Sequence, residues 1–180
     1  MGRNKEPEIR ERLLEACTDF VLETGMPDKL QTLATASGTS ARMLLYHFGT
    51  RQQLLQEVLR RARRRQREDF EQLLRAREGE DYRTTLTNAW VGIVGATGQR
   101  YLNIFDRLRE DQRQQLWPGF RREATTDWLV PLEDGLRTIG RPELATLVLA
   151  VMRGLIMDMS ATGDRPRADR AFAQFMTSLQ

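Results

Sequence analysis

The chain has 180 residues, of which 40% are hydrophobic and 29% are charged, so it can form one or two modest domains with a buried core. Its single cysteine excludes an internal disulfide, and its single histidine argues against a metal site built from histidine and cysteine. Neither a charged-then-apolar signal segment at Met1 nor a run of about 18 apolar residues is present. We therefore expect a soluble, cytoplasmic protein with no membrane partner, no metal and no cofactor.

Positive charge is concentrated at one end of the sequence. Residues 1–67 hold 13 Lys and Arg against 8 Asp and Glu, whereas residues 68–180 hold 15 against 17. A basic N-terminal third joined to a mildly acidic remainder is typical of a nucleic-acid-binding head on a body with a different role.

Helical periodicity dominates the first part of the chain. Apolar residues recur at helical spacing over about Glu8–Glu23, where Cys17 indicates a small buried hydrophobic side chain rather than a redox sensor. Gly25–Pro27 ends this helix, and Asp28 can cap a second helix over about Lys29–Ser37.

A tight turn separates the second predicted helix from the third. Gly38 can adopt the left-handed conformation that ends a helix, and either Thr39 or Ser40 can cap the next one, which reaches about Tyr46. Thr50 then caps a longer helix. Two short helices joined by a glycine-containing turn form a helix-turn-helix, whose second helix enters the major groove of DNA.

The residues from Leu33 to Leu55, LATASGTSARMLLYHFGTRQQLL, resemble the signature of the TetR family of bacterial transcriptional regulators. The resemblance covers about Ile9–Leu59, and its combined spacing is specific. It implies an all-α homodimer that binds palindromic operator DNA and releases it when the body binds a small molecule, most often as a repressor. Two heads on one dimer read half-sites that lie about one helical turn, or a multiple of it, apart.

Four positions depart from the family's usual pattern. Arg42 replaces a small residue and offers a guanidinium that can pair with guanine, and Leu45 replaces a tyrosine that contacts phosphate. Lys29 stands where Thr or Ser commonly caps the helix, and Arg51 replaces a lysine with its charge retained. From the family's contact positions, we predict that the DNA-binding residues are Lys29, Thr39, Ser40, Ala41, Arg42, Tyr46, His47, Thr50 and Arg51. Among them we expect three residues to lie in the major groove: Ser40, Arg42 and Tyr46. We expect four to contact phosphates: Tyr46, His47, Thr50 and Arg51.

The helix that follows the head continues to about Arg77 and contains the arginine-rich run 60–67. This run is either a patch for nucleic acid or an anionic ligand, or a solvated face. In the second interpretation its charge is partly neutralised at helical distances by Glu57, Glu68, Asp69 and Glu71. The resemblance favours the solvated face, because it assigns residues 50–77 to a linking helix that points away from the groove.

The rest of the sequence predicts helices only, giving about nine in an all-α fold. Asp81 is expected to cap the first of them, and Pro131 to kink a helix over about 120–138 or to end its first half. The most apolar helix covers about Pro142–Ala161, with its proline in the first turn, and an amphipathic helix follows over about 167–179.

These last two helices are the predicted dimer interface. A helix as apolar as Pro142–Ala161 must be buried on two sides, and a glycine within it allows close approach of another backbone. The predicted interface residues are Leu147, Val151, Gly154, Leu155, Phe172, Phe175 and Met176. The chain then divides into a DNA-binding domain, residues 1–49, and a ligand-binding and dimerisation domain, residues 50–180.

Aromatic and methionine side chains of the body can line an apolar pocket for a small-molecule effector, although such residues more often form ordinary core. The candidates are Trp90, Tyr101, Phe105, Trp117, Trp128, Met152 and Met157.

Two other functional classes fit the sequence less well. We expect no catalytic residues, because the chain has no nucleophile elbow, HExxH, CxxC or phosphate-binding glycine loop. The alternative is a helical partner-binding protein whose head has lost sequence-specific DNA binding, which Leu45 and Lys29 favour. The hydrogen-bond donors that remain at the family's contact positions favour DNA binding instead.

Overall fold

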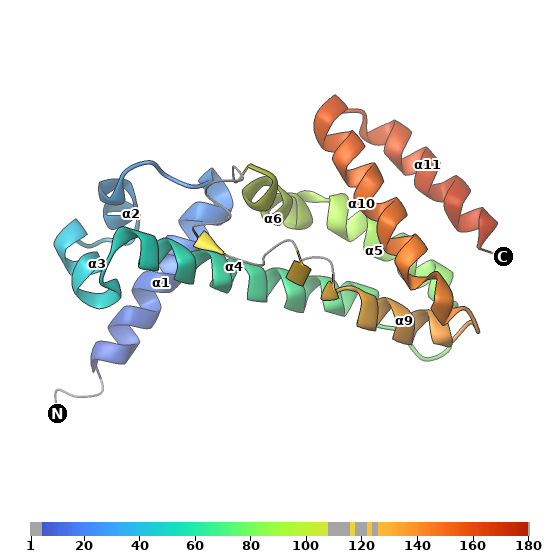
Figure 1. The fold of residues 1–180 in the computed structure, drawn as a ribbon, viewed down its shortest axis with the longest axis horizontal. Helices are drawn as coiled ribbons and strands as arrows, with labels where there is room; N and C mark the ends of the chain where they lie inside the picture. Colours follow the sequence, from blue (N-terminus) through green and yellow to red (C-terminus); the bar gives the residue numbers. More distant parts are fainter. Residues whose placement is uncertain (1–4, 108–115, 118–121, 124–125, 180) are drawn as a thin grey trace. The chain divides into compact units, whose positions relative to one another are not determined.

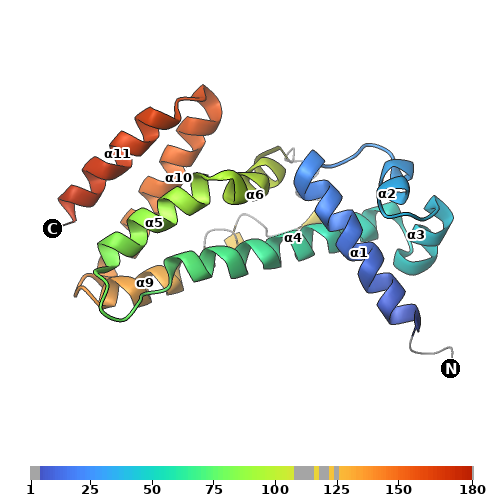
Figure 2. The same cartoon turned by 180° about the vertical axis from the view of Figure 1, so that it is seen from behind.

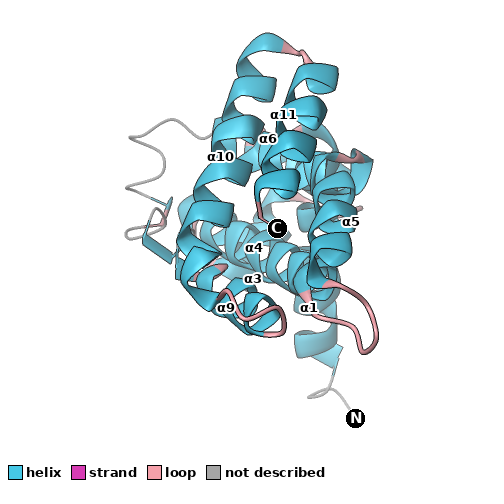
Figure 3. Cartoon of the chain, turned by 90° about the vertical axis from the view of Figure 1, so that its right-hand side faces the viewer, coloured by secondary structure: helices cyan, strands magenta, loops and turns pink. Residues whose placement is uncertain are grey.

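The computed structural model describes residues 5–107, 116–117, 122–123 and 126–179. Within these ranges it contains nine α-helices, one 3-10 helix and no strand, which confirms the predicted all-α fold (Figure 1; Figure 3). The α-helices are α1 (Lys5–Thr24), α2 (Leu30–Ala36), α3 (Ala41–Phe48), α4 (Arg51–Leu74), α5 (Tyr82–Val94), α6 (Ala96–Arg107), α9 (Leu129–Arg137), α10 (Ala145–Thr162) and α11 (Arg165–Ser178). The 3-10 helix η1 covers Pro142–Leu144.

Packing divides the described residues into two compact units. Unit 1 is drawn from Met1–Gln66 and Gln99–Phe120, and unit 2 from Arg67–Gly98 and Arg121–Gln180. Residues 51–66 of α4 therefore pack with the helix-turn-helix, although the functional boundary after residue 49 remains a prediction.

The core of unit 1 is built from the apolar faces of its first four helices, which lie side by side (Figure 2). Its fully buried residues include Cys17, Val21, Leu33, Leu44 and Val58. Burial raises the pKa of the Cys17 thiol, because the charged thiolate loses its water. Cys17 is thus a core residue, as predicted.

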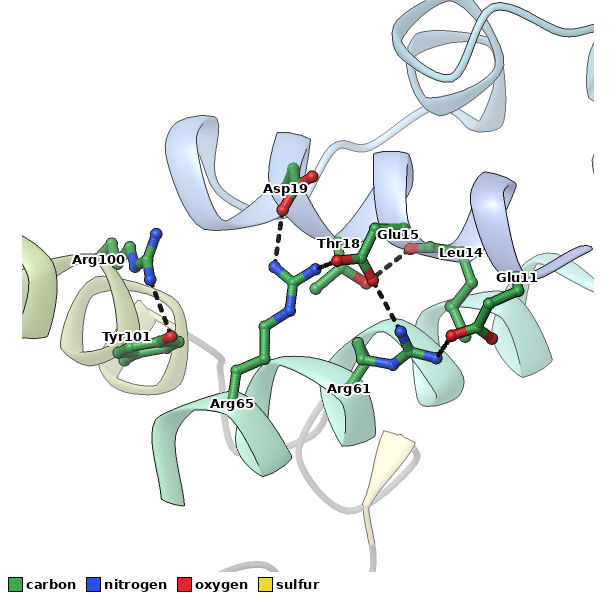
Figure 4. Close-up of polar contacts among 9 residues, drawn as sticks. All are labelled: Glu11, Leu14, Glu15, Thr18, Asp19, Arg61, Arg65, Arg100 and Tyr101. Carbon is green, nitrogen blue, oxygen red and sulfur yellow. Dashed lines mark hydrogen bonds and ion pairs between the residues drawn. The ribbon is translucent and has the colours of Figure 1, made fainter. Parts of the chain in front are cut away.

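Helix α1 is also joined to α4 by a set of ion pairs that we call the arginine ladder (Figure 4). Arg61 donates to Glu11 and Glu15, and Arg65 donates to Glu15 and Asp19. Helix packing thus brings the acidic side of α1 beside Arg61 and Arg65, which the sequence analysis did not foresee; partial neutralisation of the run within its own helix remains a prediction.

Two predicted helix starts also differ from the structure. The N-cap position of α2 is occupied by Lys29, whose backbone is extended and whose side chain makes no capping hydrogen bond. The prediction that Asp28 caps this helix was therefore wrong by one residue. A turn at residues 127–128 interrupts the predicted helix over about 120–138, and α9 begins at Leu129, so Pro131 lies in its first turn. This fits the alternative in which the first half of the helix ends near Pro131, rather than a kink. A proline is tolerated there because the N–H groups of the first turn have no intrahelical partner.

Close packing around Tyr82 holds the centre of unit 2. The ring is almost fully buried, and its hydroxyl donates to the Leu74 carbonyl at 2.9 Å. A Cβ at Gly135 of α9 would lie only 1.9 Å from the Tyr82 Cζ atom, so only glycine fits. Burial raises the pKa of Tyr82, which therefore stays neutral.

Helices α10 and α11 form an antiparallel pair in unit 2 (Figure 1). Asp164 accepts a hydrogen bond from the Arg167 N–H at 3.0 Å and caps α11. The stretch Pro142–Thr162 has a mean hydropathy of 1.6, with 28% of its most apolar window buried. By length and composition alone it is long and apolar enough to cross a membrane, but helices of soluble cores meet the same criterion.

Candidate nucleic-acid interface

The turn between α2 and α3 has the geometry predicted from its residues. Gly38 has a φ of 67°, and the Thr39 N–H donates to the Ala34 carbonyl at 2.9 Å, which closes the end of α2. The Ser40 hydroxyl accepts from the Met43 N–H at 3.2 Å. Ser40 rather than Thr39 is therefore the cap of α3.

The start of α4 is fixed by a reciprocal capping box. Thr50 Oγ1 accepts from the Gln53 N–H at 3.1 Å, and Gln53 Oε1 accepts from the Thr50 N–H at 2.9 Å. This confirms Thr50 as a cap and shows that Gln53, which the sequence analysis missed, completes it. The hydroxyl proton of Thr50 is not used in this box and can be donated to a phosphate.

Helix α3 has one buried side and one exposed side. Leu44 and Phe48 are buried. Arg42 is exposed, as is Tyr46, which is 66% exposed. The outward side of α3 can therefore approach a surface without disturbing the core.

Arg10 of α1 holds the C-terminal end of α3 in place. Its guanidinium carbon lies 4.7 Å from the centre of the Phe48 ring, and its Nε donates to the His47 carbonyl at 3.2 Å. The same side chain pairs with Glu57 of α4 at 2.5 Å. One arginine thus joins three helices, a role that helical periodicity alone does not reveal because its partners are 37 and 47 positions away.

Tyr46 and His47 make contacts that limit how they can meet DNA. The Tyr46 hydroxyl donates to Glu6 at 2.7 Å, and this hydrogen bond raises the pKa of Tyr46. His47 is half-buried, and its Nε2 atom is buried without a hydrogen-bond partner among the described residues. A phosphate can reach that atom only if neighbouring side chains move.

The other predicted contact residues lie at the starts of α2, α3 and α4. Lys29 is exposed, whereas Thr39 and Ala41 are half-buried. Arg51 is exposed and donates to the Pro27 carbonyl at 2.8 Å, so it also stabilises the loop between α1 and α2. All nine predicted DNA-binding residues belong to unit 1, and their contact with DNA remains a prediction.

The predicted effector residues are divided between the two units. Tyr101 and Trp117 belong to unit 1, and the side chain of Phe105 lies outside the described residues. The residues placed in unit 2 are Trp90, Trp128, Met152 and Met157, of which Met157 is largely exposed.

Trp90 already has a complete set of partners in unit 2. Its ring stacks on Phe172 with centroids 4.7 Å apart, and its Nε1–H donates to Asp169 at 2.7 Å. Trp128 similarly packs against Phe70, with centroids 5.5 Å apart. These two side chains contribute to the core, and a contact with an effector remains a prediction for both.

The predicted dimer residues differ in how exposed they are on the single chain. Leu147 is exposed, and a Cβ at Gly154 would meet nothing within 4 Å. Val151, Leu155 and Phe175 are half-buried. Phe172 and Met176 are buried within the protomer, so they stabilise α11 from inside.

No group of three or more His, Cys, Asp or Glu side chains in the described part of the chain is arranged to hold a metal ion.

No protein-family model matches the sequence, and no curated protein sequence matches it. The fold is similar to that of solved regulators. A transcriptional regulator from Rhodococcus sp. Rha1 gives a TM-score of 0.71 at 21% identity over 94% of both chains. A TetR-like transcriptional regulator from Rhodococcus sp. RHA1 gives 0.61 at 20% identity, covering 95% of this chain and 92% of that one.

The multidrug binding protein EbrR, complexed with imidazole, gives a TM-score of 0.62 at 21% identity, covering 97% of this chain and 93% of EbrR. The chain has the fold of TetR-family regulators over nearly its whole length, which confirms the resemblance at the level of fold.

Proposed function

We propose that this protein is a TetR-like transcriptional regulator that binds palindromic operator DNA as a homodimer. The observation that carries this proposal is the exposed side of α3, which presents Arg42 on a helix fixed at both ends. Ser40 caps its start, and Arg10 holds its end against α1 and α4. The shared fold supports the proposal, and regulators of this kind act in the cytoplasm.

In this proposal base reading and positioning are separate tasks. Arg42 offers a bidentate donor for a guanine in the major groove. Lys29 and Arg51 are exposed cations at the starts of α2 and α4, and the Thr50 hydroxyl keeps its proton for a phosphate.

The test is selection of DNA from a random pool, followed by sequencing of the bound fraction. We expect a palindrome, and we expect Arg42→Ala to lose about 1–3 kcal/mol of binding free energy on it while keeping its weaker affinity for random DNA. Equal losses on selected and random DNA would reduce Arg42 to a backbone contact. Retention without any sequence preference would support the helical partner-binding alternative.

A homodimer through α10 and α11 is the second part of the proposal. Helix α10 is apolar, yet only 28% of its most apolar window is buried in the single chain, and Leu147 and Gly154 are among its exposed residues. We expect Gly154→Leu to weaken the dimer by preventing close helix approach, whereas Gly154→Ala should have a smaller effect. Analytical ultracentrifugation measures both, and an unchanged dimer in Gly154→Leu would move the interface elsewhere.

The third part is release of DNA by a small molecule, which makes the protein a ligand-responsive repressor. EbrR, a structural neighbour, is a multidrug binding protein, which supports a small-molecule effector. Quenching of the fluorescence of Trp90, Trp117 and Trp128 by a compound panel, together with loss of the DNA complex, would identify the effector. A compound that quenches fluorescence without releasing DNA would argue against this coupling.

A further inference from the structure

Helix α3 exposes two apolar side chains as well as Arg42. Met43 is 41% exposed and Leu45 is 40% exposed. Leu44 and Phe48 already provide the buried contacts of this helix. The exposed parts of Met43 and Leu45 are available to a ligand that meets the outward side of α3.

The helical register places these two side chains on opposite flanks of Arg42. Successive residues of an α-helix are rotated by about 100°, so Leu45 lies about 60° to one side of Arg42 and Met43 about 100° to the other. By the same register Tyr46 lies about 40° from Arg42, between it and Met43, so the outward side of α3 presents Arg42 and Tyr46 with an apolar side chain on either side. Lys29 and Arg51, before α2 and at the start of α4, are also exposed cations. These charges suit a polyanion rather than an apolar protein surface.

The major groove offers one apolar group to a protein, the C5-methyl group of thymine. We propose that Leu45 and Met43 recognise the methyl groups of thymines that neighbour the guanine contacted by Arg42. This inference rests on the proposed function and adds base specificity to it. It also gives Leu45 a role, since a leucine has no hydroxyl to donate to a phosphate.

The experiment replaces thymine by deoxyuridine, which lacks only the C5-methyl group and keeps the same charge and base pairing. Operator DNA from the selection is made with deoxyuridine in place of one thymine at a time in one half-site. The equivalent thymine of the other half-site is then replaced as well. For the wild-type protein we expect affinity to fall about fourfold for each recognised methyl group, which corresponds to burial of one methyl-sized apolar group. Substitution at the equivalent thymines of both half-sites should give about sixteenfold.

The variants identify which side chain recognises which methyl group. Leu45→Ala and Met43→Ala should each bind the thymine operator more weakly and each become insensitive to deoxyuridine at one position. Val130→Ala is the matched control, because Val130 is 62% exposed on α9 and belongs to unit 2. It should keep the full response to deoxyuridine, and circular dichroism should show all three variants folded.

Equal affinity of the wild-type protein for the thymine and deoxyuridine operators would overturn the inference, although the proposed function would stand. The same holds if both alanine variants keep the wild-type response to deoxyuridine. A selection that yields no sequence preference would overturn the proposed function itself.

Discussion

Units 1 and 2 both have apolar cores, but exposed ion pairs add to the core of unit 1 whereas closely packed rings dominate unit 2. In unit 1 the arginine ladder links α1 to α4 through ion pairs whose carboxylates are about half exposed. In unit 2 the helices meet through buried rings, with Tyr82 against Gly135 and Trp90 stacked on Phe172. Exposed ion pairs are weak and are screened by salt, whereas packed rings tolerate almost no change in volume. The two units should therefore respond to different perturbations.

The largest effect is expected from one added methyl group in unit 2. In Gly135→Ala the new Cβ would overlap the Tyr82 ring, so we expect the free energy of unfolding to fall by about 3 kcal/mol, near the upper end for overpacking. Denaturant unfolding followed by circular dichroism measures this. Adding Tyr82→Leu to the variant should recover part of the loss, and an unchanged midpoint for Gly135→Ala would show that the contact is loose.

The arginine ladder predicts a smaller effect that depends on salt. Glu15 accepts from both Arg61 and Arg65, so we expect Glu15→Gln to lower the free energy of unfolding by about 1 kcal/mol at low ionic strength. In about 1 M salt the difference should become smaller, because the screening length falls to about 3 Å and these ion pairs are partly exposed. Glu23→Gln, an exposed position on the same helix, is the control. A loss that persists undiminished in high salt would indicate packing rather than charge.

The smallest effect concerns the contact between Glu6 and Tyr46. Glu6→Gln removes a negative charge near the proposed DNA surface and weakens the hold on the Tyr46 hydroxyl, so we expect about two- to fivefold tighter DNA binding. Filter binding or fluorescence anisotropy measures this change. The pKa of Tyr46 should fall towards its ordinary value. Glu8→Gln removes the same charge from the first turn of α1 without that hydrogen bond. If both variants gain equally, the hydrogen bond itself has no role.

Local features of the fold could be predicted from the sequence. Ser40, Thr50 and Asp81 act as caps because a cap needs only a side-chain oxygen and the next few residues. The cap at Asp28 was wrong because a pattern fixes a helix start only to within a residue or two.

Contacts between distant residues could not be predicted in this way. Periodicity shows which side of α1 is acidic, but it does not show which arginines of α4 lie opposite. The same reason explains why the role of Arg10 and the hydrogen bond from Tyr46 to Glu6 were missed, since the partners lie 37 to 47 positions apart. For the candidate site, the sequence predicted that α3 offers Arg42 and Tyr46 to DNA. It missed the contacts of Arg10 with His47 and Phe48, which hold the C-terminal end of α3.

The buried phenol of Tyr82 sets an alkaline limit for the protein. Burial raises its pKa above the ordinary value of 10.0, so at lower pH the folded and unfolded forms are both neutral and the packing contributes fully. Above that value the unfolded chain releases a proton that the folded chain retains, and each further pH unit removes up to about 1.4 kcal/mol of stability. Tyr82, which packs against Gly135 in unit 2, is thus also the side chain whose ionisation at high pH favours unfolding.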